Sequence, residues 1–376
     1  MLTNSSYRFT KTLFLFLLIS IIGINQFAYT QTSTGNDNNR VKIPNSESIK
    51  IHSSIVDQEY ELQIHYPRGY EDSDKKYPVI YLLDSQWDFP LITALYGQLF
   101  YDGFLPGVLV VGITWGGENP NHDYLRARDF TPTNSAQLPQ SGGASKFLQF
   151  IKEELIPYID SEYKSDKDKR VLMGSSFGGL FTLYTMFNET ELFNGYIAGS
   201  PAIQWDNEIT FNYENEFAKK SSKLPAKLYI PIGELESTEL FKKFVSQLKS
   251  RNYDGLELQE QIVKGVGHSG NKADGYTRGL QFVFKRPSLK LKNSILDQYV
   301  GNYVAGPGYN IQFVNEDSQL VAILPGDQKF VLSAESEKDF YLPGQFLFLH
   351  FKKDDKGKVT GFNFEQYTGE FFIPKQ

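Results

Sequence analysis

Residues 171–185, VLMGSSFGGLFTLYT, join an apolar run to a helical pattern through two serines set between glycines. Within them, residues 174–178, GSSFG, fit the pattern G-x-S-x-G. In a nucleophile elbow a strand ends in a strained turn that exposes a serine hydroxyl, and a helix follows directly. Neighbours of that serine must be small, because strand, helix and substrate approach closely there. We therefore predict a strand over 170–174, a helix over 176–188 and Ser176 as nucleophile; a plain glycine turn with a serine cap is the alternative.

Strand and helix patterns alternate on both sides of this turn. Strand patterns occur at 76–84, 106–114, 170–174, 195–201, 227–233 and 256–265. Apolar residues recur at helical spacing at 89–100, 143–163, 176–188, 237–251 and 273–284. This alternation predicts a mostly parallel sheet flanked by helices, preceded by an antiparallel hairpin over 47–67 that turns at Asp57. Residues 115–142 and 202–224 are expected to be loops that shape a pocket.

The pattern changes after Pro287. The rest of the chain consists of short alternating segments separated by Gly, Asn and Asp turns, without a convincing helix between them. Such a pattern is typical of an antiparallel barrel or sandwich. We therefore expect an α/β domain over 47–286 and a small all-β antiparallel barrel or sandwich over 293–376.

The N-terminal thirty residues have the parts of a secretory signal peptide. Two positive charges precede an apolar run over 13–24, and small residues follow at the spacing of a cleavage site. The run is short for a membrane span, although an uncleaved membrane anchor is the alternative interpretation. We expect a signal peptide over 1–30, a polar linker over 31–46, and a mature protein that is periplasmic or secreted.

The composition narrows the classes of function. The 376 residues are 40% hydrophobic, so a sizeable core can form, and the formal net charge is −6. Loss of the signal peptide would remove two positive charges, Arg8 and Lys11, and no acid, so the net charge of the mature protein would be −6 − 2 = −8. This negative charge disfavours nucleic acid or an anionic membrane as partner. The chain has no cysteine, which excludes disulfides, thiolate catalysis and cysteine-based zinc sites. We expect neither a metal nor an organic cofactor.

A serine hydroxyl is a poor nucleophile without a base, and histidine is the candidate base here. The chain has five histidines: His52, His65, His122, His268 and His350. Two lie in the predicted hairpin, one in a predicted loop and one in the C-terminal barrel. His268, in GVGHSG, follows the last predicted strand of the sheet. Functional groups of α/β proteins gather where parallel strands end, so His268 is the predicted base, with a turn histidine as the alternative.

The base needs a carboxylate that fixes its tautomer. A serine–acid–histidine order along the chain requires the acid between the two residues, and IPIGELESTEL offers Glu234, Glu236 and Glu239 just past a strand. Glu236 is preferred because it falls on the loop after Gly233 rather than on the next helix, and Glu234 is the second candidate. The alternative is that these glutamates complement the dipole of that helix.

The negative oxygen of a tetrahedral intermediate needs hydrogen-bond donors. The backbone N–H of Phe177, directly after the nucleophile, is one predicted donor. The second is expected from the loop after the strand over 76–84, where the N–H of Gln86 is preferred and that of Ser85 is the alternative.

Three further side chains are candidates for substrate binding. Trp87 and Trp205 are placed to wall a cleft, and a core position is the alternative for each. Arg128, with its neighbours Arg126 and Asp129, is placed either to orient a substrate or to brace its loop by ion pairing.

Together these segments resemble the putative-esterase (esterase D and enterochelin esterase-like) family of α/β-hydrolases. The matching pieces are YPVIYLLDSQWDF, GSSFGG, IPIGELES and GVGHSG, in that order, with YLRARDFTPT similar to the family's loop before the serine helix. The resemblance covers about residues 45–286 and implies an α/β-hydrolase fold. It also implies a catalytic triad and oxyanion hole made by Ser176, Glu236, His268, Gln86 and Phe177. The chain differs in having Ser85 where the family often has glycine, and a glutamate where many members have aspartate as the acid.

These features predict a secreted or periplasmic serine hydrolase of carboxylic esters that works through an acyl-enzyme. The resemblance implies siderophore triesters, or feruloyl and acetyl esters on carbohydrates, as substrate classes, and it likens the tail to small β-barrel domains of extracytoplasmic hydrolases. An acyltransferase of the same fold and a non-catalytic binding protein are the alternatives. The expected partner is a small-molecule or glycan ester, with no nucleic acid and no membrane after signal removal.

Overall fold

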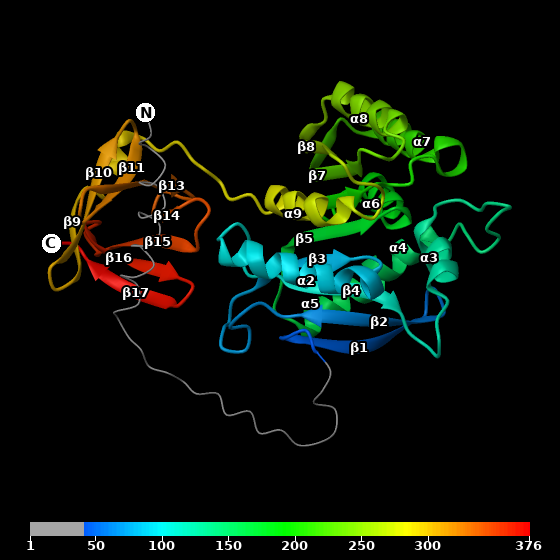
Figure 1. The fold of residues 1–376 in the computed structure, drawn as a ribbon, viewed down its shortest axis with the longest axis horizontal. Coiled ribbons are helices and arrows are strands. Elements are labelled where there is room, and N and C mark those ends of the chain that lie inside the picture. Colours follow the sequence, from blue (N-terminus) through cyan, green and yellow to red (C-terminus); the bar gives the residue numbers. More distant parts are fainter. Residues whose placement is uncertain (1–40) are drawn as a thin grey trace, which may run out of the picture. The chain divides into compact units, whose positions relative to one another are not determined.

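The computed structural model describes residues 41–376; the predicted signal peptide over 1–30 and most of the predicted linker over 31–46 lie outside the described residues. Within the described part, one large mixed sheet with flanking helices is followed by two antiparallel sheets (Figure 1). Both parts of the predicted fold class, a mostly parallel sheet flanked by helices and an all-β C-terminal part, are confirmed.

The large sheet has the strand order β1-β2-β4-β3-β5-β6-β7-β8. Its strands are β1 (Ser46–Ser53), β2 (Gln58–His65), β3 (Tyr77–Leu82), β4 (Leu109–Trp115), β5 (Ser165–Ser175), β6 (Gly195–Gly199), β7 (Lys223–Gly233) and β8 (Asp254–Val263). β1 and β2 form the predicted antiparallel hairpin, with Asp57 in the turn at a φ of 58°. β2 is also antiparallel to β4, whereas the neighbouring pairs from β4 to β8 are parallel. The C-terminal ends of the parallel strands therefore share one edge of the sheet.

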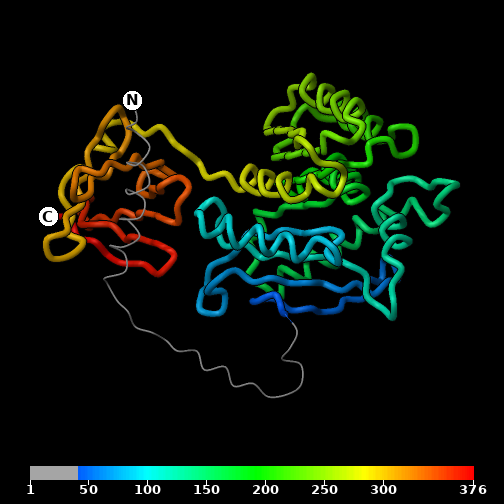
Figure 2. Tube along the Cα trace, in the orientation of Figure 1, coloured from blue at the N-terminus to red at the C-terminus, as the bar shows by residue number. Residues whose placement is uncertain are grey.

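Helices cover both faces of this sheet. They are α2 (Ser85–Tyr101), α3 (His122–Phe130), α4 (Ala144–Phe150), α5 (Ile156–Glu162), α6 (Phe177–Asn188), α7 (Trp205–Lys220), α8 (Glu239–Arg251) and α9 (Asn271–Val283), with a π-helical turn, η1 (Ile151–Leu155), between α4 and α5. α2 and α9 pack on one face through side chains such as Phe89 and Leu280. α4, α6 and α8 contribute Phe147, Phe181 and Phe244 to the core on the other face. Figure 2 shows the same alternation of strand and helix along the chain path.

Two helices lie where loops were predicted. α3 occupies part of the segment 115–142, and α7 occupies most of 202–224. α3 is short and begins at a capping residue, Asn121, which accepts a hydrogen bond from the N–H of Tyr124. α7 is interrupted near its start, where three consecutive residues have positive φ. Helical periodicity did not reveal either helix because each buries few apolar side chains.

The C-terminal part consists of two antiparallel sheets, in the orders β12-β11-β10-β9 and β13-β14-β15-β16-β17. The strands are β9 (Gly301–Gly306), β10 (Tyr309–Glu316), β11 (Gln319–Leu324), β12 (Gln328–Val331), β13 (Ser333–Ala334), β14 (Asp339–Tyr341), β15 (Leu347–Lys353), β16 (Val359–Gln366) and β17 (Gly369–Pro374). A bridge between Tyr303 and Lys375 joins their edges, and both sheets share one aromatic-rich core. One helical turn that the pattern did not predict, α10 (Asn293–Leu296), precedes β9; four residues are too few to show helical periodicity. The domain boundary at 286–293 stays a prediction.

His350 links three strands of the second C-terminal sheet by charge. Its Nδ1 lies 2.9 Å from Asp339 Oδ1 and its Nε2 lies 3.3 Å from Glu365 Oε2. The bond to Glu365 is the largest cause that raises the pKa of the His350 ring, and the bond to Asp339 adds to it against the effect of burial. The pKa of each carboxyl is lowered in turn: for Glu365 the bond to His350 dominates, and for Asp339 bonds from Ser336 and His350 outweigh burial.

The contribution of this cluster to stability is expected to be largest at mildly acidic pH. The raised pKa of His350 makes its contribution complete below about pH 6.5 and lost as pH rises through that pKa, whereas the lowered carboxyl pKa values make theirs complete above about pH 4.5 and lost on acidification. His350→Gln is expected to lower the free energy of unfolding by about 1–2 kcal/mol at pH 5.5 and by much less at pH 9. Urea denaturation at both pH values measures this, with the exposed His52→Gln as control. An equal cost at the two pH values would contradict the ion-pair account.

Candidate active site

The predicted elbow is present as a strand–turn–helix. Ser176 lies between the end of β5 and the start of α6, with φ 61° and ψ −118°. A non-glycine residue with positive φ is strained, and such strain is concentrated at functional turns. A Cβ at Gly174 would lie 2.8 Å from the backbone carbon of Gly178. Gly174 is therefore required by the close approach of strand and helix.

The residues predicted for catalysis follow neighbouring parallel strands. Ser176 follows β5, Glu236 follows β7 and His268 follows β8, with β6 between the first two strands in the sheet. The N–H of Ser176 donates to the carbonyl of Gly199, the last residue of β6, at 2.9 Å. Ser200, the next residue, reaches Glu236 through its side chain at 2.6 Å. One edge of the sheet thus collects the serine, the acid and the histidine.

Glu236 and His268 are joined directly. His268 Nδ1 lies 2.6 Å from Glu236 Oε2, while Glu236 Oε1 accepts hydrogen bonds from Ser200 Oγ at 2.6 Å and from the N–H of Gly233 at 2.8 Å. Burial alone would raise the pKa of Glu236, but the bonds from Ser200, His268 and Gly233 outweigh it and lower the pKa. The carboxylate is therefore held ionised against the ring, which leaves Nε2 of His268 as the nitrogen that faces away from the acid.

Glu234, the second candidate for the acid, has a different role. Its Oε2 accepts a hydrogen bond from the N–H of Gly265 at 2.8 Å. The structure therefore brings Glu236, and not Glu234, to the histidine. Within residues 41–376 the hydroxyl of Ser176 makes no hydrogen bond to the ring of His268. Such bonds are often long in the absence of substrate and shorten in the reactive complex.

The two predicted oxyanion donors lie in the first turns of two helices. Phe177 begins α6 and Gln86 is the second residue of α2, and these helices follow β5 and β3, which are neighbours in the sheet. The first N–H groups of a helix have no intrahelical acceptor, so they are available to a negative oxygen. Both polar atoms of the Gln86 side chain are buried, and among the described residues they have no hydrogen-bond partner.

A buried ion pair fixes the start of α2. Arg126, on α3, donates two hydrogen bonds to Asp84, at 3.0 and 2.9 Å. Asp84 immediately precedes α2 and has a φ of 55°. Arg126 also lies over the rings of Phe177, at 5.2 Å, and Trp87, at 5.6 Å. This pair therefore positions the turn that carries the N–H of Gln86 next to the start of α6.

Arg128 has the bracing contacts that were one of its two expected roles. Its Nε donates to Asp129 at 2.7 Å, and its Nη1 donates to Gln58 at 3.2 Å. Asp129 is buried and also accepts hydrogen bonds from Tyr60 and Trp115, each at 2.7 Å. The pair connects α3 to β2 and β4.

A cavity of about 370 Å³ adjoins the elbow. It is lined by Asn134, Ser135, Ala136, Gln137, Phe177, Ala202, Gln204, Trp205 and Asp206. Trp205 packs edge-on against Phe177, with ring centroids 5.2 Å apart, and its Nε1 donates to Thr133 at 3.0 Å. Trp205 therefore lines this cavity, which agrees with the prediction of a cleft wall and not with the alternative of a core position. Trp87 is half-exposed and lies under Arg126, outside this lining.

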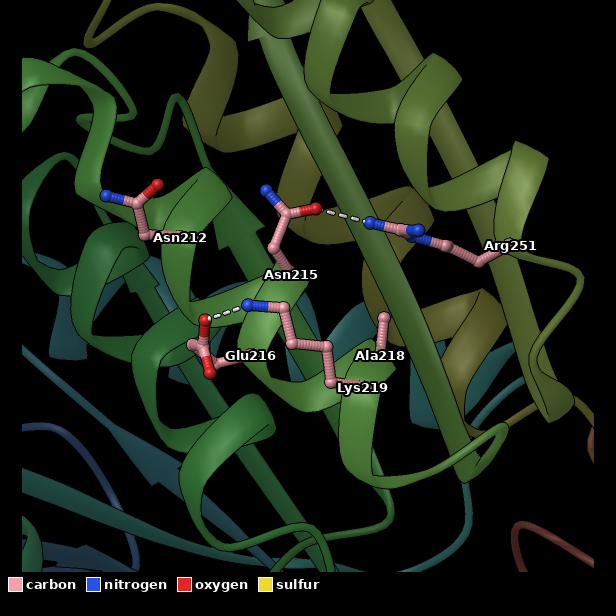
Figure 3. Close-up of a pocket in the computed structure, with 6 residues that line it drawn as sticks. All are labelled: Asn212, Asn215, Glu216, Ala218, Lys219 and Arg251. Carbon is pink, nitrogen blue, oxygen red and sulfur yellow. Dashed lines mark hydrogen bonds and ion pairs between the residues drawn. The ribbon is translucent and has the colours of Figure 1, made fainter.

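A second cavity, of about 450 Å³, lies between α7 and α8 (Figure 3). It is lined by the ends of these helices, which lead into the starts of β7 and β8. The starts of parallel strands lie at the edge opposite their C-terminal ends, so this cavity is separate from the elbow. Its charged side chains are paired: Lys219 with Glu216, and Arg251 with Glu214.

The comparison with known proteins decides the family. Residues 53–301 match the family model described as Putative esterase. The chain belongs to the Putative esterase family. The matched segment runs from the end of β1 to the first residue of β9, so most of the two C-terminal sheets lies outside it.

Named relatives of this esterase share the fold and the class of reaction. It is 33% identical over 275 residues to the ferri-bacillibactin esterase BesA of Bacillus subtilis (strain 168), covering 67% of this chain and 94% of BesA. The crystal structure of an IroE-like serine hydrolase from Shewanella oneidensis superposes with a TM-score of 0.59 and 27% identity, covering 68% of this chain and 85% of that one. The siderophore hydrolase EstB from Aspergillus nidulans gives a TM-score of 0.56 and 25% identity, covering 67% and 99%. The chain is a serine carboxylic ester hydrolase.

The described part of this esterase has neither a cluster of metal ligands nor a helix that could span a membrane. Among residues 41–376 there is no group of three or more His, Cys, Asp or Glu side chains that could hold a metal ion. The helices in the same range include none that is long and apolar enough to span a bilayer.

The sequence did not reveal the residues that support the acid. Ser200 bonds to Glu236, and the Nδ2 of Asn271 donates to Ser200 Oγ at 2.6 Å and to the carbonyl of His268 at 2.7 Å. Ser200 carries one usable signal, because it lies at the C-terminal end of the strand predicted over 195–201, where polar side chains gather. Asn271 carries no such signal in the sequence, because its contacts depend on how the loop after β8 folds back.

Proposed function

We propose that this esterase hydrolyses its substrate through an acyl-enzyme on Ser176, with His268 as the base and Glu236 as the acid that orients it. The observation that carries the proposal is the 2.6 Å contact between Glu236 and His268 on the sheet edge that also bears the elbow. A carboxylate on Nδ1 favours the tautomer whose Nε2 accepts a proton, and it stabilises the charged ring that results.

The proposed reaction has two halves. His268 Nε2 takes the proton of Ser176 as the hydroxyl oxygen attacks the ester carbonyl, and the N–H groups of Phe177 and Gln86 stabilise the oxygen that becomes negative. Collapse of the intermediate breaks the bond to the alcohol, which leaves with the proton from His268. A water molecule then gives its proton to the same nitrogen as it attacks the acyl group, and that proton returns to Ser176 Oγ when the bond to the acyl group breaks and the acid is released.

We further propose siderophore-type esters as the substrates, with acyl esters on carbohydrates as the second class. Support comes from the names of BesA and EstB, a ferri-bacillibactin esterase and a siderophore hydrolase that align with most of the α/β part. The composition of residues 1–30, with two positive charges, an apolar run and small residues, supports export to the periplasm or beyond.

Rapid mixing with a p-nitrophenyl ester tests the acyl-enzyme. We expect a burst of p-nitrophenol close to one equivalent per chain, followed by slower turnover, and an acyl mass on the peptide that contains Ser176. The acid-quenched peptide identifies the acylated residue, so it is the deciding observation. An acyl group on another residue would contradict the proposal.

Acyl transfer is the remaining alternative reaction of this site. The same assay with added glycerol or glucose distinguishes the two by products. Hydrolysis predicts free acid as the main product, whereas an acyltransferase would give the glycerol or sugar ester instead.

A further inference from the structure

We propose that the cavity beside Ser176, defined by the nine lining residues given above, selects uncharged or cationic ester arms over anionic ones, and that Asp206 sets this preference. The inference rests on the proposed function, because it names the substrate class for the same site. It concerns the arm of the ester that lies beyond the reacting carbonyl.

The position of the cavity makes it part of the substrate path. Phe177, in its lining, directly follows Ser176, and the N–H of Ala202, also in the lining, donates to the carbonyl of Ser176 at 3.1 Å. A volume of about 370 Å³ is at the lower end of the range for small-molecule sites. A substrate arm bound here would continue directly from an acyl or alcohol group at the serine.

The side chains that line the cavity are uncharged, with one exception. Eight of the nine lining side chains are amides, hydroxyl, methyl or aromatic groups, and the ninth is the carboxylate of Asp206. Asp206 makes no ion pair within residues 41–376; its Oδ1 has only a long contact, 3.4 Å, from Asn207 Nδ2. An anionic arm would meet an unneutralised negative charge, while a neutral arm finds amide and hydroxyl partners.

Three cations on α3 and α9 are already neutralised by carboxylates. Arg126 is paired with Asp84 and Arg128 with Asp129, and both carboxylates are buried. Lys272, near the start of α9, is paired with Asp88 at 2.8 Å. None of these cations is left to offset the charge of Asp206 or to hold an anionic arm.

The proposed preference for uncharged over anionic arms distinguishes two kinds of iron chelate. Three catecholates, each with charge −2, give a ferric complex of charge −3, whereas three hydroxamates, each with charge −1, give a neutral one. For ester-linked siderophores, the cavity therefore favours the arms of a neutral hydroxamate chelate over those of a catecholate chelate.

Pairs of esters that differ only in charge test the proposal. p-Nitrophenyl 4-carbamoylbenzoate and mono-p-nitrophenyl terephthalate place the charge on the acyl side; 4-acetoxybenzamide and 4-acetoxybenzoate place it on the alcohol side. We expect the wild type to prefer the neutral member of at least one pair. Asp206→Asn should narrow that preference in kcat/KM about fivefold, the factor for one charge–charge contact near 4 Å in water, and 1 M salt should reduce the change.

The backbone at this position makes the variants comparable. Asp206 and Glu208 both have positive φ, 42° and 63°, in the interrupted start of α7, and asparagine tolerates that region well. Glu208 does not line the cavity and is paired with Lys243 at 2.8 Å, so Glu208→Gln is the matched control and should leave the ratios unchanged.

Three outcomes overturn the inference. A charge preference that Asp206→Asn leaves within twofold of wild type removes Asp206 from the role, and so does an equal change in Glu208→Gln. A wild type that prefers the neutral member of neither pair removes the selectivity itself. In these cases ester hydrolysis continues and the proposed function stands; if no ester of either pair is hydrolysed, the proposed function fails and this inference fails with it.

Discussion

Ser176→Ala is expected to lower kcat for a p-nitrophenyl ester by about 10⁴- to 10⁶-fold, because the hydroxyl is the atom that forms the bond to the acyl group. Loss of the nucleophile removes the acyl-enzyme route, and what remains is the weak catalysis that binding and the oxyanion donors give to attack by water. Steady-state kinetics measures the loss, and circular dichroism verifies that the variant is folded.

Ser175→Ala is the matched control for this experiment. Ser175 lies in the same GSSFG segment as the last residue of β5, and it is only 2% exposed. We expect its variant to keep activity within about tenfold of wild type, since a buried neighbouring hydroxyl does not reach the substrate. Ser176→Ala activity above about one per cent of wild type, or an equal loss in Ser175→Ala, would contradict the assignment of the nucleophile.

Glu236→Gln is expected to lower kcat by about 10³- to 10⁴-fold with little change in fold. The glutamine amide can donate to Nδ1 of His268, which favours the tautomer that carries its proton on Nε2 and cannot accept one from Ser176. The amide also cannot stabilise the charged ring. The variant keeps the size of the side chain, so a loss of this order reports the charge and not the packing.

Glu234→Gln separates the two candidate acids. Glu234 receives a hydrogen bond from the N–H of Gly265 and does not contact the histidine, so we expect its variant to retain kcat within about tenfold. Kinetics of both variants over pH 5–9 provides the comparison. The assignment would be wrong if Glu234→Gln lost more activity than Glu236→Gln, or if both lost less than tenfold.

The order of strands and helices around the elbow was readable from the sequence because each has a strong local signal. β3 and β4 are continuous apolar runs buried on both faces, and α8 has a clear apolar stripe. α3 and α7 were not predicted because tertiary contacts, rather than an apolar stripe, hold them. In α7 the buried residues include Thr210 and Glu214, and Glu214 is stabilised by bonds from Arg251 and Tyr253.

The candidate site also contains residues that the sequence predicted and residues that it did not reveal. Chain order and the rule that functional groups follow parallel strands led to Ser176, Glu236 and His268, of which the structure joins the last two. Ser200 and Asp84 were not found because their roles depend on which strands become neighbours and on loops from distant parts of the chain. A sequence read one segment at a time shows which residues end strands, but it does not show which of those ends meet.

The structure of the chain after reaction with an alkyl fluorophosphonate tests the central claim most directly. The account predicts phosphorus bonded to Ser176 Oγ, with the phosphoryl oxygen about 3 Å from the N–H groups of Phe177 and Gln86. It also predicts His268 Nε2 within about 3.2 Å of an oxygen on phosphorus, with Glu236 still bonded to Nδ1. An adduct on another residue, or an adduct on Ser176 that the ring of His268 does not approach, would contradict it.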